Sequence, residues 1–190
     1  MKKIVLVNGP PGSGKDTIAE ALAELYETAE VEKFAKPIKE TVKFIYGISD
    51  KLWDEIDGDQ EKKNVGSPLF LGHSCRQVQI NISELYMKPT HGKFVFGKLA
   101  ADRIDRSENQ VFCISDSGFP EEAEVMVDRF GAENVVLIRL YRAKCDFSND
   151  SRDYIDLQHR GVPTYDLLNN GTIKEAVDQV VSFIQIKGIV

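Results

Sequence analysis

Short apolar runs alternate along the chain with longer segments in which apolar residues recur every three or four positions. The runs have the length of buried strands, and the three-to-four spacing is typical of helices. The predicted strands cover residues 3–8, 31–35, 111–115, 134–141 and 164–168. The predicted helices cover residues 14–27, 37–46, 74–88, 93–106, 120–130 and 172–186. Because apolar strands that alternate with helices form parallel sheets covered on both faces, the pattern predicts a three-layer α/β fold with roughly five parallel strands.

The middle of the chain is less regular. Ser49 or Asp50 is expected to cap a brief helix. Residues 57–73 are rich in Gly, Asp and Lys, so we expect a mobile loop there. The helix that begins near Ser74 is expected to stop before Pro89, because the residue preceding a proline disfavours the helical conformation.

The most informative segment, residues 9–17, reads Gly-Pro-Pro-Gly-Ser-Gly-Lys-Asp-Thr and lies between the first predicted strand and the first predicted helix. A G-x-x-x-x-G-K match in that context predicts a phosphate-binding loop. Gly9, Gly12 and Gly14 permit positive φ, so that N–H groups converge on one anion, and the helix N-terminus adds further N–H groups. Lys15 supplies a positive charge, so we expect a nucleoside triphosphate to bind. The residues expected to contact it are Gly9, Gly12, Ser13, Gly14, Lys15, Asp16 and Thr17.

Three residues with side-chain oxygens are candidate Mg²⁺ ligands. Asp16 stands where the motif usually has Ser or Thr, and a carboxylate suits Mg²⁺ directly or through water. Thr17 follows as a second candidate. Asp116 comes after the strand over 111–115, where it either holds Mg²⁺ through water or accepts a proton from an acceptor hydroxyl. Structural roles stay open, because the helix dipole favours an acid at position 16 and Asp116 also suits a turn.

Phosphoryl transfer needs positive charge around the moving group, and guanidinium groups bind phosphate in a bidentate manner. Arg139 and Arg142 lie near the end of a predicted strand, and Arg152 lies in a polar loop suited to closing over the nucleotide. The candidate catalytic residues are Lys15, Asp116, Arg139, Arg142 and Arg152. The candidate substrate-binding residues are Lys36, Lys39, Arg76 and Lys88. Each of these arginines and lysines is also compatible with a solvated surface position.

Composition narrows the class of protein. The 190 residues are 42% hydrophobic and 28% charged, which is typical of a soluble globular protein and fits a single domain over 1–190. No apolar run approaches the about 20 residues of a membrane span, and no signal peptide is recognised, so we expect a cytoplasmic protein that contacts no membrane. Cys75, Cys113 and Cys145 lack metal-ligand spacing and are expected to be reduced, without zinc. The net charge of −6 argues against a broad nucleic-acid surface.

Further motifs carry a resemblance to a known family. They are Phe34-Ala35-Lys36-Pro37-Ile38-Lys39, Arg76-Gln77, Ser115-Asp116-Ser117-Gly118-Phe119 and Asn169-Asn170-Gly171. With its Gly-Ser-Gly-Lys-Asp-Thr loop, the chain resembles the tailed-phage deoxynucleoside monophosphate kinases of the adenylate kinase-like P-loop group. The resemblance implies a P-loop kinase fold, ATP and Mg²⁺ as cofactors, transfer of the γ-phosphoryl group to a deoxynucleoside monophosphate, and Asn170 beside the adenine. It also implies an acceptor-binding segment at about 36–106, a lid-like loop at about 143–162, a monomer or homodimer, and the cytoplasm of the host cell as the location.

Two departures from the family pattern leave the acceptor open. Residues 47–75 are short where those kinases have a longer acceptor-binding insertion, and the long arginine-rich lid is replaced by residues 144–152. An open acceptor side brings in a neighbouring phage group, the kinases that phosphorylate the hydroxymethyl group of 5-hydroxymethyluracil in DNA, since such a cleft admits a flipped base. For DNA, the candidate backbone contacts are Lys88, Lys93 and Lys98. A regulatory NTPase switch is the alternative from a different class of function.

Overall fold

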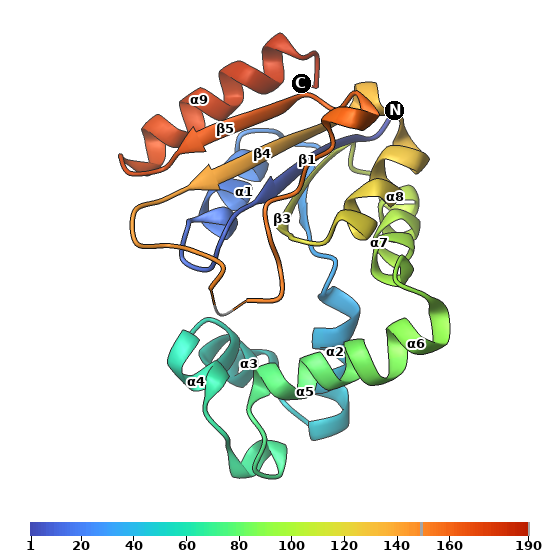
Figure 1. Ribbon diagram of the computed structural model, residues 1–190, viewed down its shortest axis with the longest axis vertical. Helices are drawn as coiled ribbons and strands as arrows, with labels where there is room; N and C mark the ends of the chain where they lie inside the picture. Colours follow the sequence, from blue (N-terminus) through green and yellow to red (C-terminus); the bar gives the residue numbers. More distant parts are fainter. Residues whose placement is uncertain (149, 190) are drawn as a thin grey trace. The chain divides into compact units, whose positions relative to one another are not determined.

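The computed structural model describes residues 1–148 and 150–189, and within them five strands form one parallel sheet (Figure 1). The strands are β1 (Lys3–Asn8), β2 (Ala29–Glu32), β3 (Val111–Ser117), β4 (Val135–Tyr141) and β5 (Thr164–Leu168). Their order across the sheet is β2-β3-β1-β4-β5, and every neighbouring pair is parallel. The predicted α/β class and the five-stranded parallel sheet are confirmed.

Helices connect the strands and cover the sheet. The α-helices are α1 (Lys15–Glu24), α2 (Lys36–Tyr46), α3 (Asp50–Asp57), α4 (Gln60–Asn64), α5 (Cys75–Asn81), α6 (Lys88–His91), α7 (Val95–Arg106), α8 (Pro120–Phe130) and α9 (Ile173–Ile186). The shorter helical segments are η1 (Pro68–Phe70), η2 (Ile82–Met87), η3 (Ala132–Asn134) and η4 (Gln158–Arg160). Helices α1 and α9 lie on one face of the sheet, and α7 and α8 lie on the other (Figure 1).

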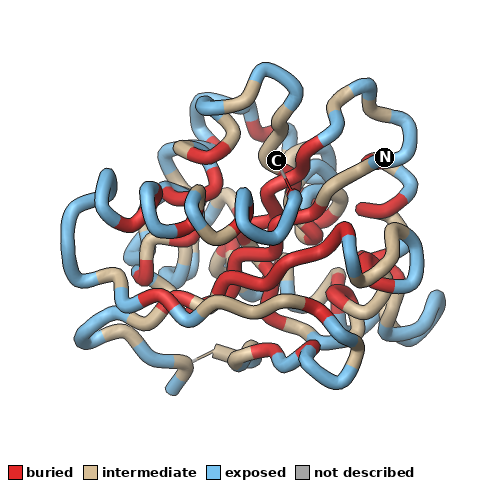
Figure 2. The backbone as a smooth tube through the Cα atoms, turned by 90° about the horizontal axis from the view of Figure 1, so that it is seen from above, coloured by how far each residue is buried: buried red, intermediate tan, exposed pale blue. Residues whose placement is uncertain are grey.

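Both faces of the central strand β1 are buried. Val5 and Val7 belong to a cluster with apolar residues of α1 and α9, while Ile4 and Leu6 alternate with them and are equally inaccessible to solvent. A strand that is buried on both faces consists of an unbroken apolar run, which explains why its sequence signal was clear. Strands β3 and β4 are likewise buried along most of their length, whereas β2 and β5 are only partly buried. Figure 2 shows the buried segments in the interior, and the helices alternate between buried and exposed residues.

The contacts divide the described chain into two compact units. One, the sheet unit, consists of Met1–Phe34 and the chain from Phe96 onward, and the other, the helical unit, consists of Ala35–Val95. The segment over 36–106 that was predicted to bind the acceptor includes nearly all of the helical unit and the whole of α7. In the described residues, no helix has the length and apolar composition needed to cross a bilayer.

The prediction of an uninterrupted loop over 57–73 was wrong. Helix α4 and the 3₁₀ turn η1 lie within that range. Asp59 caps α4 by accepting the backbone N–H groups of Glu61 and Lys62, and Ser67 caps η1. Polar residues that are frequent in loops are also the preferred N-cap residues, so composition alone misjudged the segment.

The prediction that a helix stops before Pro89 was also wrong. The π-helical segment η2 leads directly into α6, and the N–H group of Lys88 reaches five residues back to the carbonyl of Ser83. A π-helical turn is wider than an α-helical one, so the chain there accommodates a residue that lacks an N–H group. The prediction that Ser49 or Asp50 caps a brief helix is confirmed, because the Ser49 hydroxyl accepts the N–H group of Leu52.

Several boundaries in the sheet unit differ from the predicted ones, among them those of α1, β2 and β3. Helix α1 ends at Glu24 rather than near residue 27, and its last turn is closed by a bond from the N–H group of Leu25 to the carbonyl of Leu22. Strand β2 pairs with β3 from Ala29 to Glu32, so it begins and ends earlier than the predicted 31–35. The ends of a strand such as β2 depend on its pairing with β3, which lies far away in the sequence.

Candidate active site

The phosphate loop leaves the carboxyl end of β1 and enters α1. Gly12 has φ +78° and Gly14 has φ +96°, the left-handed conformations that were predicted there. Gly9 does not need positive φ, contrary to prediction. It is required because a Cβ atom at Gly9 would lie 2.7 Å from Oγ of Ser13 and 2.9 Å from the carbonyl oxygen of Leu140. The loop is therefore tightly packed against β4, with its backbone turned as a phosphate cradle requires.

Two polar side chains of the loop are buried. Lys15 is 8% exposed, and its Nζ donates to the carbonyl oxygen of Pro10 at 2.8 Å. Burial lowers the pKa of Lys15 to about 8, with a further lowering by the charge of Arg152, against which Asp16, Asp150 and Asp116 act. The hydroxyl of Ser13 is buried and has no hydrogen-bond partner among the described residues. The ammonium group of Lys15 and the hydroxyl of Ser13 are both hydrogen-bond donors at the loop. Both are therefore suited to bind a phosphate oxygen in the cradle.

Two of the candidate magnesium ligands, Asp16 and Asp116, have defined hydrogen-bond partners. Asp16 lies in the first turn of α1 and accepts the hydroxyl of Ser115 at 2.6 Å and Nζ of Lys33 at 2.7 Å. Asp116 lies within β3 rather than after it, and its Oδ1 accepts the N–H group of Phe34 at 2.9 Å. Thr17 follows in α1 and is exposed.

These acids fit a magnesium ion that is held mainly by the nucleotide. Within the described residues, no three His, Cys, Asp or Glu side chains are grouped to hold a metal by themselves. Mg²⁺ usually takes one or two carboxylates together with water and substrate phosphates. Asp16 directly follows Lys15 and accepts the hydroxyl of Ser115, the neighbour of Asp116 in β3, so both acids lie at the end of the sheet that carries the phosphate loop.

The three predicted arginines have different surroundings. Nη1 of Arg142 donates to the carbonyl oxygen of Gly12 at 3.2 Å, so Arg142 contacts the phosphate loop directly. Arg139 forms a bidentate ion pair with Asp166 on the neighbouring strand, at 2.6 and 2.8 Å. Ile138 and Leu140, which flank Arg139, face the cluster of α1 and α9, so Arg139 points to the opposite face of the sheet. Its contacts favour a structural role.

Arg152 lies close to the charges of the cradle. Asp150 binds its guanidinium through two hydrogen bonds. The charge of Arg152 lowers the pKa of Lys15, and the charge of Asp116 raises the pKa of Arg152. Its stem packs on Gly118, where a Cβ atom would lie only 2.4 Å from Cδ of the arginine. The loop between β4 and β5 thus brings a second cation to the loop lysine.

Two asparagines that position the site were missed from the sequence. Asn8 is fully buried at the end of β1, where its Nδ2 donates to the carbonyl oxygens of Ser117 at 2.9 Å and Asp153 at 3.0 Å. Its Oδ1 accepts the N–H group of Ile155 at 3.1 Å. Asn8 therefore joins β1, β3 and the loop that carries Arg152. The only sequence signal was an amide that closes an apolar run, since a buried amide must be hydrogen-bonded.

Asn169, rather than its neighbour, contacts the phosphate loop. Nδ2 of Asn169 donates to the carbonyl oxygen of Ser13 at 2.8 Å and lies 2.7 Å from the Cβ position of Gly14. Asn170, the residue predicted beside the adenine, accepts the N–H group of Ala143 at 2.9 Å, and its place beside the adenine stays a prediction. The predicted turn is therefore near the loop, but its first asparagine makes the contact.

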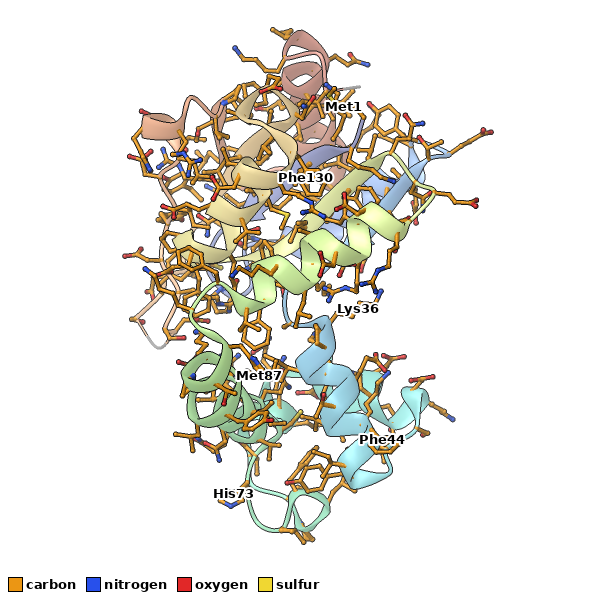
Figure 3. The ribbon with its side chains drawn as sticks, turned by 90° about the vertical axis from the view of Figure 1, so that its right-hand side faces the viewer. Met1, Lys36, Phe44, His73, Met87 and Phe130 are labelled. Carbon is orange, nitrogen blue, oxygen red and sulfur yellow. The ribbon has the colours of Figure 1, made fainter. Side chains whose placement is uncertain are left out.

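The four predicted substrate-binding residues lie in the helical unit. Lys36 begins α2, and Phe44 lies near its other end (Figure 3). Lys39 pairs with Asp57 at 2.6 Å, and Lys63 pairs with the same carboxylate. Although burial raises the pKa of Asp57, these two cations lower it to about 2.

The other two substrate-binding candidates have partners on nearby helices. Arg76 donates to the side chain of Gln60 at 3.3 Å, and Lys88 pairs with Glu84 at 2.6 Å. All four residues are therefore placed by helices of one compact unit rather than by an irregular loop.

Comparison with known proteins supports the fold. No protein-family model matches the chain, and no curated protein sequence is similar to it. A gluconokinase from Sinorhizobium meliloti 1021 superposes with a TM-score of 0.50 at 11% identity, over 97% of this chain and 92% of that one. A putative kinase from Chloroflexus aurantiacus j-10-fl gives 0.48 at 15% identity, over 98% and 97% of the two chains. A shikimate kinase from Aquifex aeolicus gives 0.46 at 13% identity, over 98% of each chain.

At such low identity, the likeness to the gluconokinase shows the fold alone. The chain shares the α/β fold of that gluconokinase, in agreement with the predicted fold class. The resemblance to phage deoxynucleoside monophosphate kinases stays a prediction from the sequence.

Asn8→Ala is expected to lower the free energy of unfolding by roughly 3 kcal/mol or more, because three groups lose their partner and each buried group without one costs about 1–3 kcal/mol. The groups concerned are the carbonyls of Ser117 and Asp153 and the N–H group of Ile155. Urea denaturation measures the change. Asn64→Ala, at an exposed position, is the control and should change stability by no more than about 0.5 kcal/mol. Equal stabilities of the two variants would contradict the role of Asn8.

Proposed function

We propose that this chain is a P-loop kinase that transfers the γ-phosphoryl group of ATP to a deoxynucleotide, with a free deoxynucleoside monophosphate as the acceptor. The observation that carries the kinase assignment is the grouping of cations and acids at the phosphate loop. Lys15 and Arg152 lie within electrostatic reach of each other, with Asp16 and Asp116 beside them. Phosphoryl transfer requires this combination of positive charge and metal-binding oxygens, whereas nucleotide binding alone does not.

The residues of the site have separate tasks in this reaction. The loop N–H groups, Lys15 and the Ser13 hydroxyl bind the phosphates, and Arg152 adds positive charge for the transferred group. Asp16 and Asp116 would hold Mg²⁺ directly or through water. The bound ion neutralises phosphate oxygens and orients them. Arg142 stabilises the loop through its bond to Gly12.

The environment of Asp116 favours a phosphate over a hydroxyl as the acceptor. The oxygen of a monophosphate is already deprotonated at neutral pH, so it needs no general base, whereas a hydroxyl acceptor does. Asp116 accepts the N–H group of Phe34, which commits one of its oxygens to the backbone. This carboxylate is therefore better suited to hold a metal ion and to fix the backbone than to accept a proton.

The choice of a deoxynucleotide rests on the resemblance to the phage kinases and on the basic residues of the helical unit. Lys36 and Lys39 lie in the segment Phe34-Ala35-Lys36-Pro37-Ile38-Lys39, which follows β2 and leads into α2. With Arg76 and Lys88 they give the acceptor segment the positive charge that a monophosphate requires. The net charge of −6 counts against DNA as the acceptor.

The acceptor is tested with labelled ATP and a panel of deoxynucleoside monophosphates, ribonucleoside monophosphates and DNA that contains 5-hydroxymethyluracil. Label is expected to pass to a deoxynucleoside monophosphate, and ATP turnover should rise when that acceptor is added. Transfer to the modified DNA with inert monophosphates would replace the proposed acceptor. ATP hydrolysis that no acceptor stimulates would instead indicate a regulatory NTPase.

Lys15→Ala is expected to lower kcat by about 10²–10³-fold, because it removes charge stabilisation from the transferring phosphate. Steady-state kinetics with the best acceptor of the panel measures the loss. Lys174→Ala is the matched control, since Lys174 lies on the exposed side of α9 and pairs with Asp178. A folded Lys15→Ala protein as active as this control would contradict the assignment of the loop as the phosphate-binding site.

ATP affinity is expected to weaken as the pH rises through about 8, the pKa to which burial lowers Lys15. Below that pH the ammonium is charged and attracts the triphosphate, and above it the charge is lost. Lys15→Arg binds through a group that stays protonated, so its affinity should show no such decline between pH 7 and pH 9. Titration calorimetry with ATP and Mg²⁺ measures both profiles, and parallel profiles would assign the decline to another group.

A further inference from the structure

We propose that Asp150 positions Arg152 for phosphoryl transfer by fixing the direction of its guanidinium near the phosphate loop. The proposal rests on the proposed function, because it concerns the charge that Arg152 brings to the transferred group. Asp150 lies in the loop between β4 and β5, two residues before Arg152. It is a positioning residue, since it acts on the reaction through the arginine.

The two side chains form a bidentate ion pair. Nε of Arg152 donates to Oδ1 of Asp150 at 2.8 Å, and Nη2 donates to Oδ2 at 2.5 Å. Oδ1 also accepts the backbone N–H group of Arg152 at 3.0 Å. Paired parallel bonds of this kind fix the plane of a guanidinium as well as its distance. One carboxylate therefore determines both the backbone turn and the direction of the arginine.

The pair is largely buried, although it does not connect distant parts of the fold. The side chain of Asp150 is 4% exposed and that of Arg152 is 22% exposed. Desolvation of a carboxylate is costly, and a pair between residues two positions apart joins no distant elements. In contrast, Arg103 and Glu32 form an ion pair that ties α7 to β2. The Asp150 pair sets the direction of a side chain, and that direction matters at the phosphate loop.

Electrostatics explains why Arg152 needs such a partner. Next to burial, the charge of Arg152 is the largest cause that lowers the pKa of Lys15, so the two cations are close enough to repel. Asp150 acts in the opposite sense on Lys15, and its hydrogen bonds are the main cause that raises the pKa of Arg152. Without this carboxylate, repulsion from Lys15 favours rotation of the long arginine side chain toward solvent.

The rest of the loop is anchored by other contacts. The stem of Arg152 packs on Gly118, and Asn8 binds the backbone of Asp153 and Ile155. Substitution of Asp150 should therefore release the guanidinium while the loop itself stays in place. This separation makes the role of Asp150 testable.

The experiment compares Asp150→Asn, Asp150→Glu and Arg152→Gln with the double variant Asp150→Asn/Arg152→Gln, in steady-state kinetics with ATP, Mg²⁺ and the best acceptor of the panel. Asp150→Asn is expected to lower kcat by about 10–100-fold, with a smaller effect on the KM for ATP. In the double variant, Asp150→Asn should cause no further loss, because its effect passes through Arg152. An equal loss with and without Arg152 would overturn the proposal.

Asp156→Asn is the matched control, since Asp156 is an exposed carboxylate of the same segment that accepts the N–H group of Gln158. It is expected to keep the activity of the wild type. Asp150→Glu retains a carboxylate and should recover part of kcat. It also carries the test if melting curves show that Asp150→Asn does not fold. A kcat of Asp150→Glu equal to that of Arg152→Gln would count against the proposal.

The ion pair is also tested without catalysis, by NMR of the protein labelled with [¹⁵N]arginine. The Nε–H signal of Arg152, assigned with Arg152→Gln, should be shifted in Asp150→Asn and unchanged in Asp156→Asn. A wild-type chain that transfers no phosphoryl group to any acceptor would overturn the proposed function. An active wild type with an equally active Asp150→Asn would overturn only the role of Asp150.

Discussion

Two cations, Lys15 and Arg152, lie near each other in a partly buried site, and much of the sheet unit is arranged to keep them there. Each is desolvated and each repels the other, so neither position is favourable by itself. Three acids, Asp16, Asp116 and Asp150, offset this repulsion from different elements, namely α1, β3 and the loop after β4. The acids keep the two cations in place, and in the proposed kinase Lys15 and Arg152 are the groups that contact phosphate oxygens while Mg²⁺ would offset the acids.

The parallel sheet makes this arrangement possible. Strand β1 lies between β3 and β4, so its carboxyl end is flanked by the ends of both neighbours. The phosphate loop and the loop with Arg152 follow the carboxyl ends of β1 and β4, and Asp116 lies near the carboxyl end of β3. Asn8 closes the arrangement, because its amide binds backbone groups of β3 and of the loop at once. The apolar burial of β1 on both faces provides the rigidity that such positioning requires.

Sequence patterns predicted those parts of the molecule that depend on local order. The apolar runs gave the strands, and the loop motif gave the conformations of Gly12 and Gly14. Asn8, Asn169 and Asp150 carry no spacing signal, because their partners lie far away in the sequence or belong to an irregular loop. The pairing of Arg139 with Asp166 could not be predicted either, because it depends on the register of β4 with β5.

The helical unit adds a second kind of constraint. Asp57 binds both Lys39 and Lys63 and is itself mostly buried, so its charge is fixed over the physiological pH range. Two lysines on one carboxylate leave a net positive charge, which needs an anion or solvent to balance it. In the proposed kinase, that excess serves the acceptor, while the excess at Lys15 and Arg152 serves ATP. The charges for ATP and those for the acceptor then belong to different compact units of the chain.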